Sequence, residues 1–190
     1  MNLPNKLTLL RMCLIPVFLL FLLWEGLPNN YLWALLTFAA ASITDTLDGQ
    51  IARRRGLVTD FGKFMDPLAD KLLVMSALVG FVDVMDVPSA VIVVILAREF
   101  LVTALRTLAA DNGVVIAADG WGKLKTVLQM FWICFTLLLL WVMAEEIGPG
   151  WVFVALSWVH IVGMILVVAV TIISGFNYMW KNRQLFLRSK

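Results

Sequence analysis

The sequence has little charge for its length. Of 190 residues only 15% are charged, whereas soluble domains have about 25%. Hydrophobic residues make up 62% of the chain. A soluble domain of this size could not bury that much apolar surface, so the excess is expected to face lipid. The net charge of +2 is too small to indicate a nucleic-acid partner.

Cysteine and histidine are also scarce, with two of the former and one of the latter. Cys13 and Cys134 lie in apolar runs without CxxC or histidine spacing. We therefore expect packed small side chains at both positions, not a disulfide or a metal pair. His160 lies in the middle of an apolar segment and is expected to be packed or hydrogen-bonded, not a metal ligand.

Six apolar segments follow one another along the chain, separated by turn residues. At about 1.5 Å per residue each is long enough to cross a hydrocarbon core of about 30 Å. They cover roughly residues 5–25, 30–54, 63–84, 87–110, 121–144 and 150–178. The pattern predicts an all-α integral membrane protein with six transmembrane helices in a single domain, 1–190. Residues 1–24 have no small-x-small cleavage site after the apolar stretch, so they are expected to stay as the first span and not to act as a signal peptide.

Basic residues are confined to one side of the predicted bundle. With six spans, all fifteen Lys and Arg fall in the termini and the second–third and fourth–fifth connections, or at the helix ends facing them. The charged residues of the other connections are all acidic, and no base lies there: Glu25, Asp83, Asp86, Glu145 and Glu146. This asymmetry places both termini in the cytoplasm. Aromatic residues are expected as interfacial anchors, the outer ones Trp24, Tyr31, Trp33, Trp141 and Trp151, and the inner ones Trp121, Tyr178 and Trp180.

Two pairs of aspartates flank the connection between the second and third segments. Asp45 and Asp48 are three residues apart, and Asp66 and Asp70 are four apart, so each pair lies on one helix face. A tight turn between antiparallel helices can bring the two faces together. Four carboxylates then need neutralising cations, and hard oxygen ligands suit one or two Mg²⁺ or Mn²⁺ ions. Magnesium usually shares its coordination with substrate phosphates, which indicates a phosphate-bearing substrate.

Small residues accompany the aspartates. Gly49, Ala52 and Gly62 leave a shallow helix surface where a ligand can approach the backbone. The alternative is a purely structural role, in which the acids form salt bridges with neighbouring bases. Four acids, three small residues and an arginine in this spacing favour a functional site. The candidate bases for such bridges are Arg53, Arg54, Arg55 and Lys63.

The string from Asp45 to Asp70 fits the pattern D-x-x-D-G-x-x-A-R-x8-G-x-x-x-D-x-x-x-D. In this it resembles the CDP-alcohol phosphatidyltransferases. The resemblance implies six transmembrane helices, usually a homodimer, and a cytoplasm-facing site with two divalent metals. It implies that an alcohol oxygen attacks the phosphorus bearing diacylglycerol in CDP-diacylglycerol and that CMP leaves. By the same resemblance Asp45, Asp48, Asp66 and Asp70 are metal ligands, Asp70 is also the general base, and Gly49, Ala52, Arg53 and Gly62 line the CDP pocket.

Further bases are predicted to lie near the same membrane face. Several guanidinium and ammonium groups fit a phosphorylated acceptor better than an uncharged one. The strings Asn2–Arg11, Ala97–Phe100 and Gly122–Met130 resemble the bacterial branch of the family whose acceptor is sn-glycerol 3-phosphate. The candidate ligands of the acceptor phosphate are Thr8, Arg11, Arg106, Lys123 and Lys125. Lys123 and Lys125 have an alternative role as cytoplasmic anchors or contacts of anionic lipids.

Other functions share parts of this pattern. Within the family the acceptor could instead be phosphatidylglycerol, inositol phosphate or serine. Intramembrane prenyltransferases also use two Asp-rich motifs, but they lack the Gly-x-x-Ala-Arg string. A cation transporter would need acids deep along several helices, whereas these collect at one face. The predicted location is the bacterial cytoplasmic (inner) membrane, as a multi-pass protein whose partners are membrane lipids and the two substrates.

Overall fold

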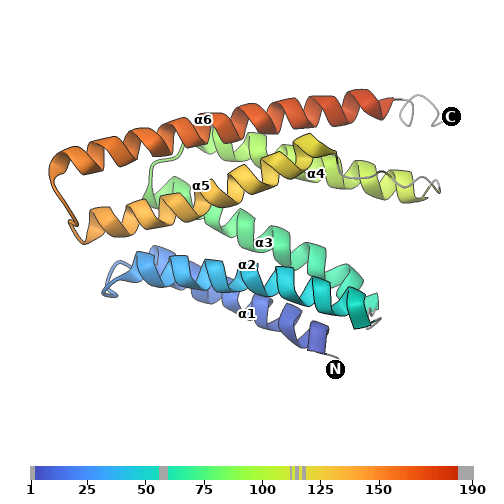
Figure 1. Ribbon diagram of the computed structural model, residues 1–190, viewed down its shortest axis with the longest axis horizontal. Coiled ribbons are helices and arrows are strands. Elements are labelled where there is room, and N and C mark those ends of the chain that lie inside the picture. Colours follow the sequence, from blue (N-terminus) through green and yellow to red (C-terminus); the bar gives the residue numbers. More distant parts are fainter. Residues whose placement is uncertain (1–2, 56–59, 112, 114–115, 117–118, 184–190) are drawn as a thin grey trace. The chain divides into compact units, whose positions relative to one another are not determined.

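The structure is a computed structural model that describes the backbone of residues 3–55, 60–111, 113, 116 and 119–183. Side chains are described for these residues except 3–6, 45–55, 60–64, 66, 67 and 111. The described backbone forms six helices and no strand, which confirms the all-α prediction (Figure 1). The helices are α1 (Leu3–Leu23), α2 (Asn30–Arg55), α3 (Asp60–Val84), α4 (Ser89–Asp111), α5 (Gly120–Ala144) and α6 (Gly150–Lys181).

The helices begin and end within three residues of the predicted bounds, and turn residues account for several of these ends. Asn29 and Asp86 adopt the left-handed conformation, with φ of 54° and 51°, which short polar side chains tolerate better than most. Pro88 and Pro149 each precede a helix, where the fixed φ of proline suits the first turn. Their carbonyls accept hydrogen bonds of 2.9 Å from the N–H groups of Val91 and Val152. Local backbone preference therefore sets these boundaries.

The chain divides into two compact units, which are described separately. The first consists of Met1–Asp86 and Ile133–Val154, and the second of Val87–Trp132 and Ala155–Lys190. Helices α5 and α6 therefore contribute residues to both units. That residues 1–190 form a single domain stays a prediction.

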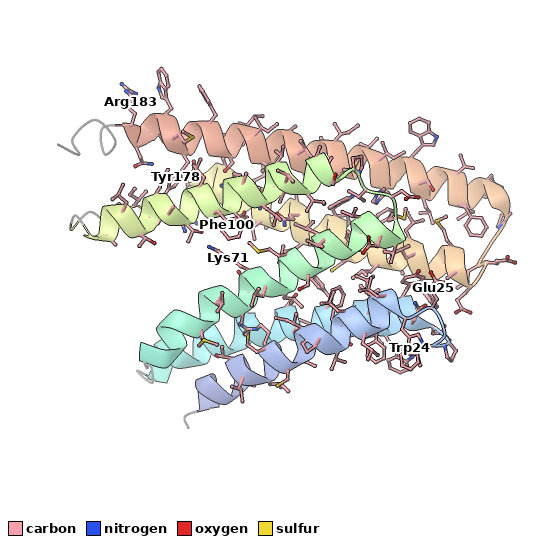
Figure 2. All side chains as sticks on the ribbon, turned by 180° about the vertical axis from the view of Figure 1, so that it is seen from behind. Trp24, Glu25, Lys71, Phe100, Tyr178 and Arg183 are labelled. Atoms are coloured by element: carbon pink, nitrogen blue, oxygen red, sulfur yellow. The ribbon has the colours of Figure 1, made fainter. Side chains whose placement is uncertain are left out.

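In the first unit α1 packs against both α2 and α3 (Figure 1). The α1–α2 contact includes the rings of Phe18 and Phe38, whose centroids are 5.6 Å apart, and both side chains are fully buried. The α1–α3 contact depends on Gly80, because a Cβ there would collide with Cδ2 of the buried Leu22. Trp24 and Glu25 lie in the turn between α1 and α2 (Figure 2).

In the second unit α6 contacts α4 and α5 through polar and aromatic groups. The ring of His160 stacks on Trp132 with a centroid distance of 5.4 Å, and Trp132 Nε1 donates to His160 O at 3.1 Å. His160 is buried, so the prediction of a packed histidine is confirmed. Gly163 makes this approach possible, since a Cβ there would lie 2.9 Å from Trp132 Cδ1.

Two sequence predictions about packing are wrong. Tyr178, expected as an interfacial anchor at the inner end of α6, does not face lipid as an anchor would: it is only 2% exposed and packs with Val102 and Leu105 of α4 (Figure 2). Its hydroxyl accepts a bond from Arg106, which explains why burial is tolerated. Cys13, expected to be packed, is an exposed free thiol, because its position on α1 lies outside the buried stripe of Ile15, Phe18 and Leu22.

Helices α5 and α6 are long and apolar enough to cross a membrane. Only 11% of the apolar window of α6 is buried within the protein, so α6 is unlike the core helix of a soluble domain. Among the described residues, α1 and α2 carry the shorter apolar stretches Leu7–Leu23 and Asn30–Thr44.

Candidate active site

The two aspartate pairs flank the connection between α2 and α3. Asp45 and Asp48 lie on the last turns of α2, which ends at Arg55, and Asp66 and Asp70 lie on the first turns of α3, which begins at Asp60. The two helices contact each other. Each pair therefore has the helical spacing that the sequence predicts. The side chains of Asp45, Asp48 and Asp66 lie outside the described part of the structure, so the metal site stays a prediction.

Asp70 is the one signature aspartate whose side chain is described, and it is exposed. Its neighbour Ala69 belongs to a buried stripe that continues along α3 with Leu73 and Ala77. This stripe fixes the rotation of α3 and leaves Asp70 beside the buried face. Asp70 has an interaction partner within the protein. An exposed carboxylate at this position is accessible to a substrate.

The residues predicted to line the CDP pocket lie on the same two helices. Gly49, Ala52 and Arg53 belong to the last turns of α2, and Gly62 belongs to the first turn of α3. Their side-chain surroundings lie outside the described part, so this assignment also stays a prediction.

Thr8 and Arg11 are both buried on α1, with exposed fractions of 1% and 0%. They are three residues apart and therefore share one helix face. Each has an interaction partner in the structure. A fully buried guanidinium in an apolar bundle is costly unless it is paired, so the position of Arg11 calls for an anionic or polar partner.

Lys125 is held by Glu99. Its side chain is 2% exposed, and its Nζ on α5 donates a hydrogen bond to Glu99 Oε1 on α4. The same oxygen also accepts a 3.3 Å bond from Arg98 Nη1. Two cations thus share one carboxylate, and the three groups carry a formal charge of +1 (two bases minus one acid).

Arg98 connects α4 to the other two helices of this unit. Its Nη2 donates to the hydroxyl of Ser174 on α6. A Cβ at Gly175 would lie 3.1 Å from Arg98 Cγ, and one at Gly122 would lie 3.6 Å from Nη2. The side chain therefore passes close to the backbones of α5 and α6, where glycine leaves room.

Arg106 and Lys123, the other predicted acceptor ligands of this unit, are exposed. Arg106 Nε donates to Tyr178 Oη at 3.2 Å, and its guanidinium lies 5.7 Å from the centre of the tyrosine ring. Lys123 is two residues before Lys125, so the two lysines point from different faces of α5. The structure thus places Lys125 in a buried ion pair and leaves Lys123 accessible.

Asp119, which was not predicted as a site residue, fixes the start of α5. Asp119 Oδ1 accepts a 2.8 Å bond from the N–H of Gly122, which is an N-cap, and Oδ2 accepts a 2.7 Å bond from Asn177 Nδ2 on α6. An aspartate two residues before the predicted segment 121–144 was a usable N-cap signal. The roles of Ser174 and Asn177 had no such local signal, because their partners are distant in the sequence.

Comparison with known sequences adds independent findings. Residues 1–173 match the family described as CDP-alcohol phosphatidyltransferase. The CDP-diacylglycerol–glycerol-3-phosphate 3-phosphatidyltransferase of Bacillus subtilis (strain 168) is 42% identical over 193 aligned positions, covering 95% of each chain. The protein of the same name from Rickettsia typhi is 41% identical over 180 positions, 93% of this chain and 94% of its own. A probable phosphatidylglycerophosphate synthase of Mycobacterium tuberculosis (strain CDC 1551 / Oshkosh) is 48% identical over 132 positions, 67% of this chain and 62% of its own.

Proposed function

The chain belongs to the CDP-alcohol phosphatidyltransferase family, and from this premise we propose that it transfers the phosphatidyl group of CDP-diacylglycerol to sn-glycerol 3-phosphate. The products are phosphatidylglycerophosphate and CMP. The observation that carries the proposal is the unbroken signature from Asp45 to Asp70, whose two halves flank one helix connection. The names of the relatives from Bacillus subtilis and Rickettsia typhi support this acceptor.

The donor set of the signature fits divalent metals. Four carboxylates lie on two contacting helices, and neither α2 nor α3 contains histidine or cysteine. Such all-oxygen sets suit Mg²⁺ or Mn²⁺ and disfavour zinc. Asp45, Asp48, Asp66 and Asp70 would hold two such ions per site. When bound, these ions would neutralise charge on the diphosphate of the donor.

The chain's own residues then bind the donor and move one proton. Gly49, Ala52, Arg53 and Gly62 would hold the CDP part. The hydroxyl oxygen of the acceptor forms a bond to the phosphorus that carries diacylglycerol, and the bond from this phosphorus to the CMP oxygen breaks. The carboxylate of Asp70 takes the hydroxyl proton, which requires hydrogen-bond distance to the attacking oxygen. Its exposure is consistent with this role.

The phosphate of the acceptor is assigned to basic and hydroxyl groups. A lysine ammonium has three N–H donors, so the bond from Lys125 to Glu99 does not exclude a further bond to phosphate. The formal charge of +1 on Arg98, Glu99 and Lys125 together also favours an anion. The other ligands in this proposal are Thr8, Arg11, Arg106 and Lys123.

We place the protein in the bacterial cytoplasmic membrane with six transmembrane helices and both termini in the cytoplasm. The confinement of all fifteen bases to one side supports this orientation. The apolar lengths of α5 and α6 support membrane insertion. The active site would then face the cytoplasm. By family resemblance the protein would act as a homodimer.

A CMP-release assay tests the function. Purified protein is supplied with Mg²⁺ or Mn²⁺, CDP-diacylglycerol and one alcohol at a time: glycerol 3-phosphate, glycerol, phosphatidylglycerol, inositol phosphate or serine. We expect CMP and phosphatidylglycerophosphate only with glycerol 3-phosphate. If CMP were released only with another alcohol, that alcohol would be the acceptor, and the protein would still belong to the family. Absence of release with every alcohol would refute the transferase proposal and leave a prenyltransferase or a cation transporter to be tested.

A further inference from the structure

A continuous series of polar contacts joins three helices of the second unit and ends at Lys125. Ser174 of α6 accepts from Arg98 of α4, Arg98 donates to Glu99 of α4, and Glu99 accepts from Lys125 of α5. We refer to Ser174, Arg98 and Glu99 as the lysine support. Its members come from positions up to 76 residues apart in the sequence, so the fold and not a local motif assembles it.

Burial makes Glu99 decisive for the position of the ammonium. The side chain of Lys125 is 2% exposed, against 11% for Arg98 and 23% for Glu99. A cation at such burial is costly without a counter-charge, so the carboxylate fixes where the ammonium lies. Lysine has a flexible four-carbon stem, and a bound carboxylate reduces the positions that it can adopt.

The lysine support is itself held firmly. Arg98 passes close to the backbones at Gly122 and Gly175, and its guanidinium is bonded at both Nη atoms. The first turn of α5, two to five residues before Lys125, is tied to α6 through Asp119 and Asn177. Displacement of the ammonium therefore requires movement of several fixed groups at once. Preorganisation of this kind is what a binding group for a small charged substrate needs.

We propose that Glu99 is a positioning residue, which, backed by Arg98 and Ser174, fixes the ammonium of Lys125 for the phosphate of the acceptor. This proposal rests on the proposed function, in which Lys125 binds that phosphate. Glu99 itself does not touch the substrate. Its effect reaches the acceptor through Lys125, so it must depend on the presence of the lysine.

A double-mutant cycle tests this dependence. Glu99→Gln, Lys125→Met and the double variant are compared with the wild type by CMP release, with full variation of both substrates. We expect Glu99→Gln to raise the KM for glycerol 3-phosphate about 10-fold or more, since it loosens a charge-assisted contact of the phosphate. The KM for CDP-diacylglycerol should stay within about twofold. In the Lys125→Met background the same change should have no further effect on the acceptor KM.

A second, milder variant keeps the test independent of folding. Ser174→Ala removes one hydroxyl from a buried position and should raise the acceptor KM a few-fold with an unchanged donor KM. Glu145→Gln is the matched control, because this acid is exposed in the α5–α6 connection. Thermal unfolding of each variant is measured alongside, and Glu145→Gln should match the wild type in every parameter.

Several results would overturn the positioning role. One is an effect of Glu99→Gln on the acceptor KM that is as large in the Lys125→Met background as in the wild type. Another is an equal change of both KM values in Glu99→Gln. The third is a loss of thermal stability in Glu99→Gln without a change in its acceptor KM. A lowered acceptor KM would show instead that Glu99 competes with the phosphate. The proposed function fails separately, when the wild type releases no CMP with glycerol 3-phosphate. If the wild type is active and Lys125→Met leaves the acceptor KM unchanged, the function stands and the positioning role does not.

Discussion

Replacement of Lys125 by methionine isolates the contribution of one buried charge. Methionine is unbranched and apolar, so it can keep the packing of the lysine stem and removes only the ammonium. Glu99 is not left without a cation, because Arg98 Nη1 still donates to it at 3.3 Å. The Glu99 carboxylate therefore keeps a counter-charge, and the loss of stability that an unpaired buried charge causes is avoided. We therefore expect Lys125→Met to fold and to be altered mainly in its binding of the acceptor.

The size of the effect follows from the burial of the side chain. A charge-assisted hydrogen bond contributes about 1.5–3 kcal/mol, which corresponds to about 10- to 150-fold in binding. At 2% exposure, salt and water screen the ammonium of Lys125 weakly, so the upper part of this range is expected. Lys123 is exposed, and a screened surface charge contributes about 0–1 kcal/mol, or at most about fivefold. The two lysines should thus differ by about an order of magnitude.

The assay is CMP release in detergent with both substrate concentrations varied. We expect the KM for glycerol 3-phosphate to rise steeply in Lys125→Met and slightly in Lys123→Met, with the KM for CDP-diacylglycerol unchanged in both. Lys181→Met, an exposed base in the last turn of α6, is the control for general loss of charge. A change in the donor KM alone, or kinetics like those of Lys181→Met, would refute the role of Lys125 in binding the acceptor. Lys125 would then be a structural or lipid-contacting residue.

Four further predictions concern the metals, the base, the topology and the packing. Activity should disappear with EDTA and return with Mg²⁺ or Mn²⁺, and Asp45→Asn should weaken metal binding measured by calorimetry; turnover in chelator would contradict the metal site. Asp70→Asn should abolish kcat, because the hydroxyl proton has no acceptor, and a variant with wild-type kcat would exclude Asp70 as the base. A reporter fused after Lys190 should read as cytoplasmic and one inserted at Gly148 as external, and the reverse reading would invert the topology. Gly80→Val should lower the unfolding free energy by about 1–3 kcal/mol, because its Cβ would collide with the buried Leu22, and an unchanged melting temperature would show that α1 and α3 can separate at no cost.

The positions of the helices were predictable from the sequence. Proline and short polar residues interrupt the apolar runs, and these features act locally, so the predicted segment 30–54 differs by one residue from α2, Asn30–Arg55. Errors appear where polar residues continue a helix. The predicted last segment ends with the apolar run at residue 178, whereas α6 continues to Lys181. Helical hydrogen bonding does not end with the apolar run, since the N–H of Asn182 still donates to Tyr178 O at 3.2 Å.

The candidate site was predictable only in part. The spacing of the aspartates along α2 and α3 follows from helical periodicity, and the structure has both helices at those positions. The pairing of Lys125 with Glu99 could not be predicted, because charge alone does not determine which acid on another helix a lysine will meet. The burial of Tyr178 could not be predicted either, since an aromatic residue near a helix end is typical both of the membrane–water interface and of a buried contact between helices.

The length of α6 has a consequence for where its last contacts lie. Its 32 residues extend about 48 Å, well beyond a hydrocarbon core of about 30 Å. Even a strong tilt of about 40° would use only about 26 residues, which leaves about six outside the core. Since the polar end of α6 is its C-terminal one, these are roughly Phe176–Lys181, the stretch that carries Asn177 and Tyr178. The bonds that these two residues make to Asp119 and Arg106 would therefore lie at the depth of the lipid head groups, where a water-soluble acceptor and a membrane-bound donor can meet.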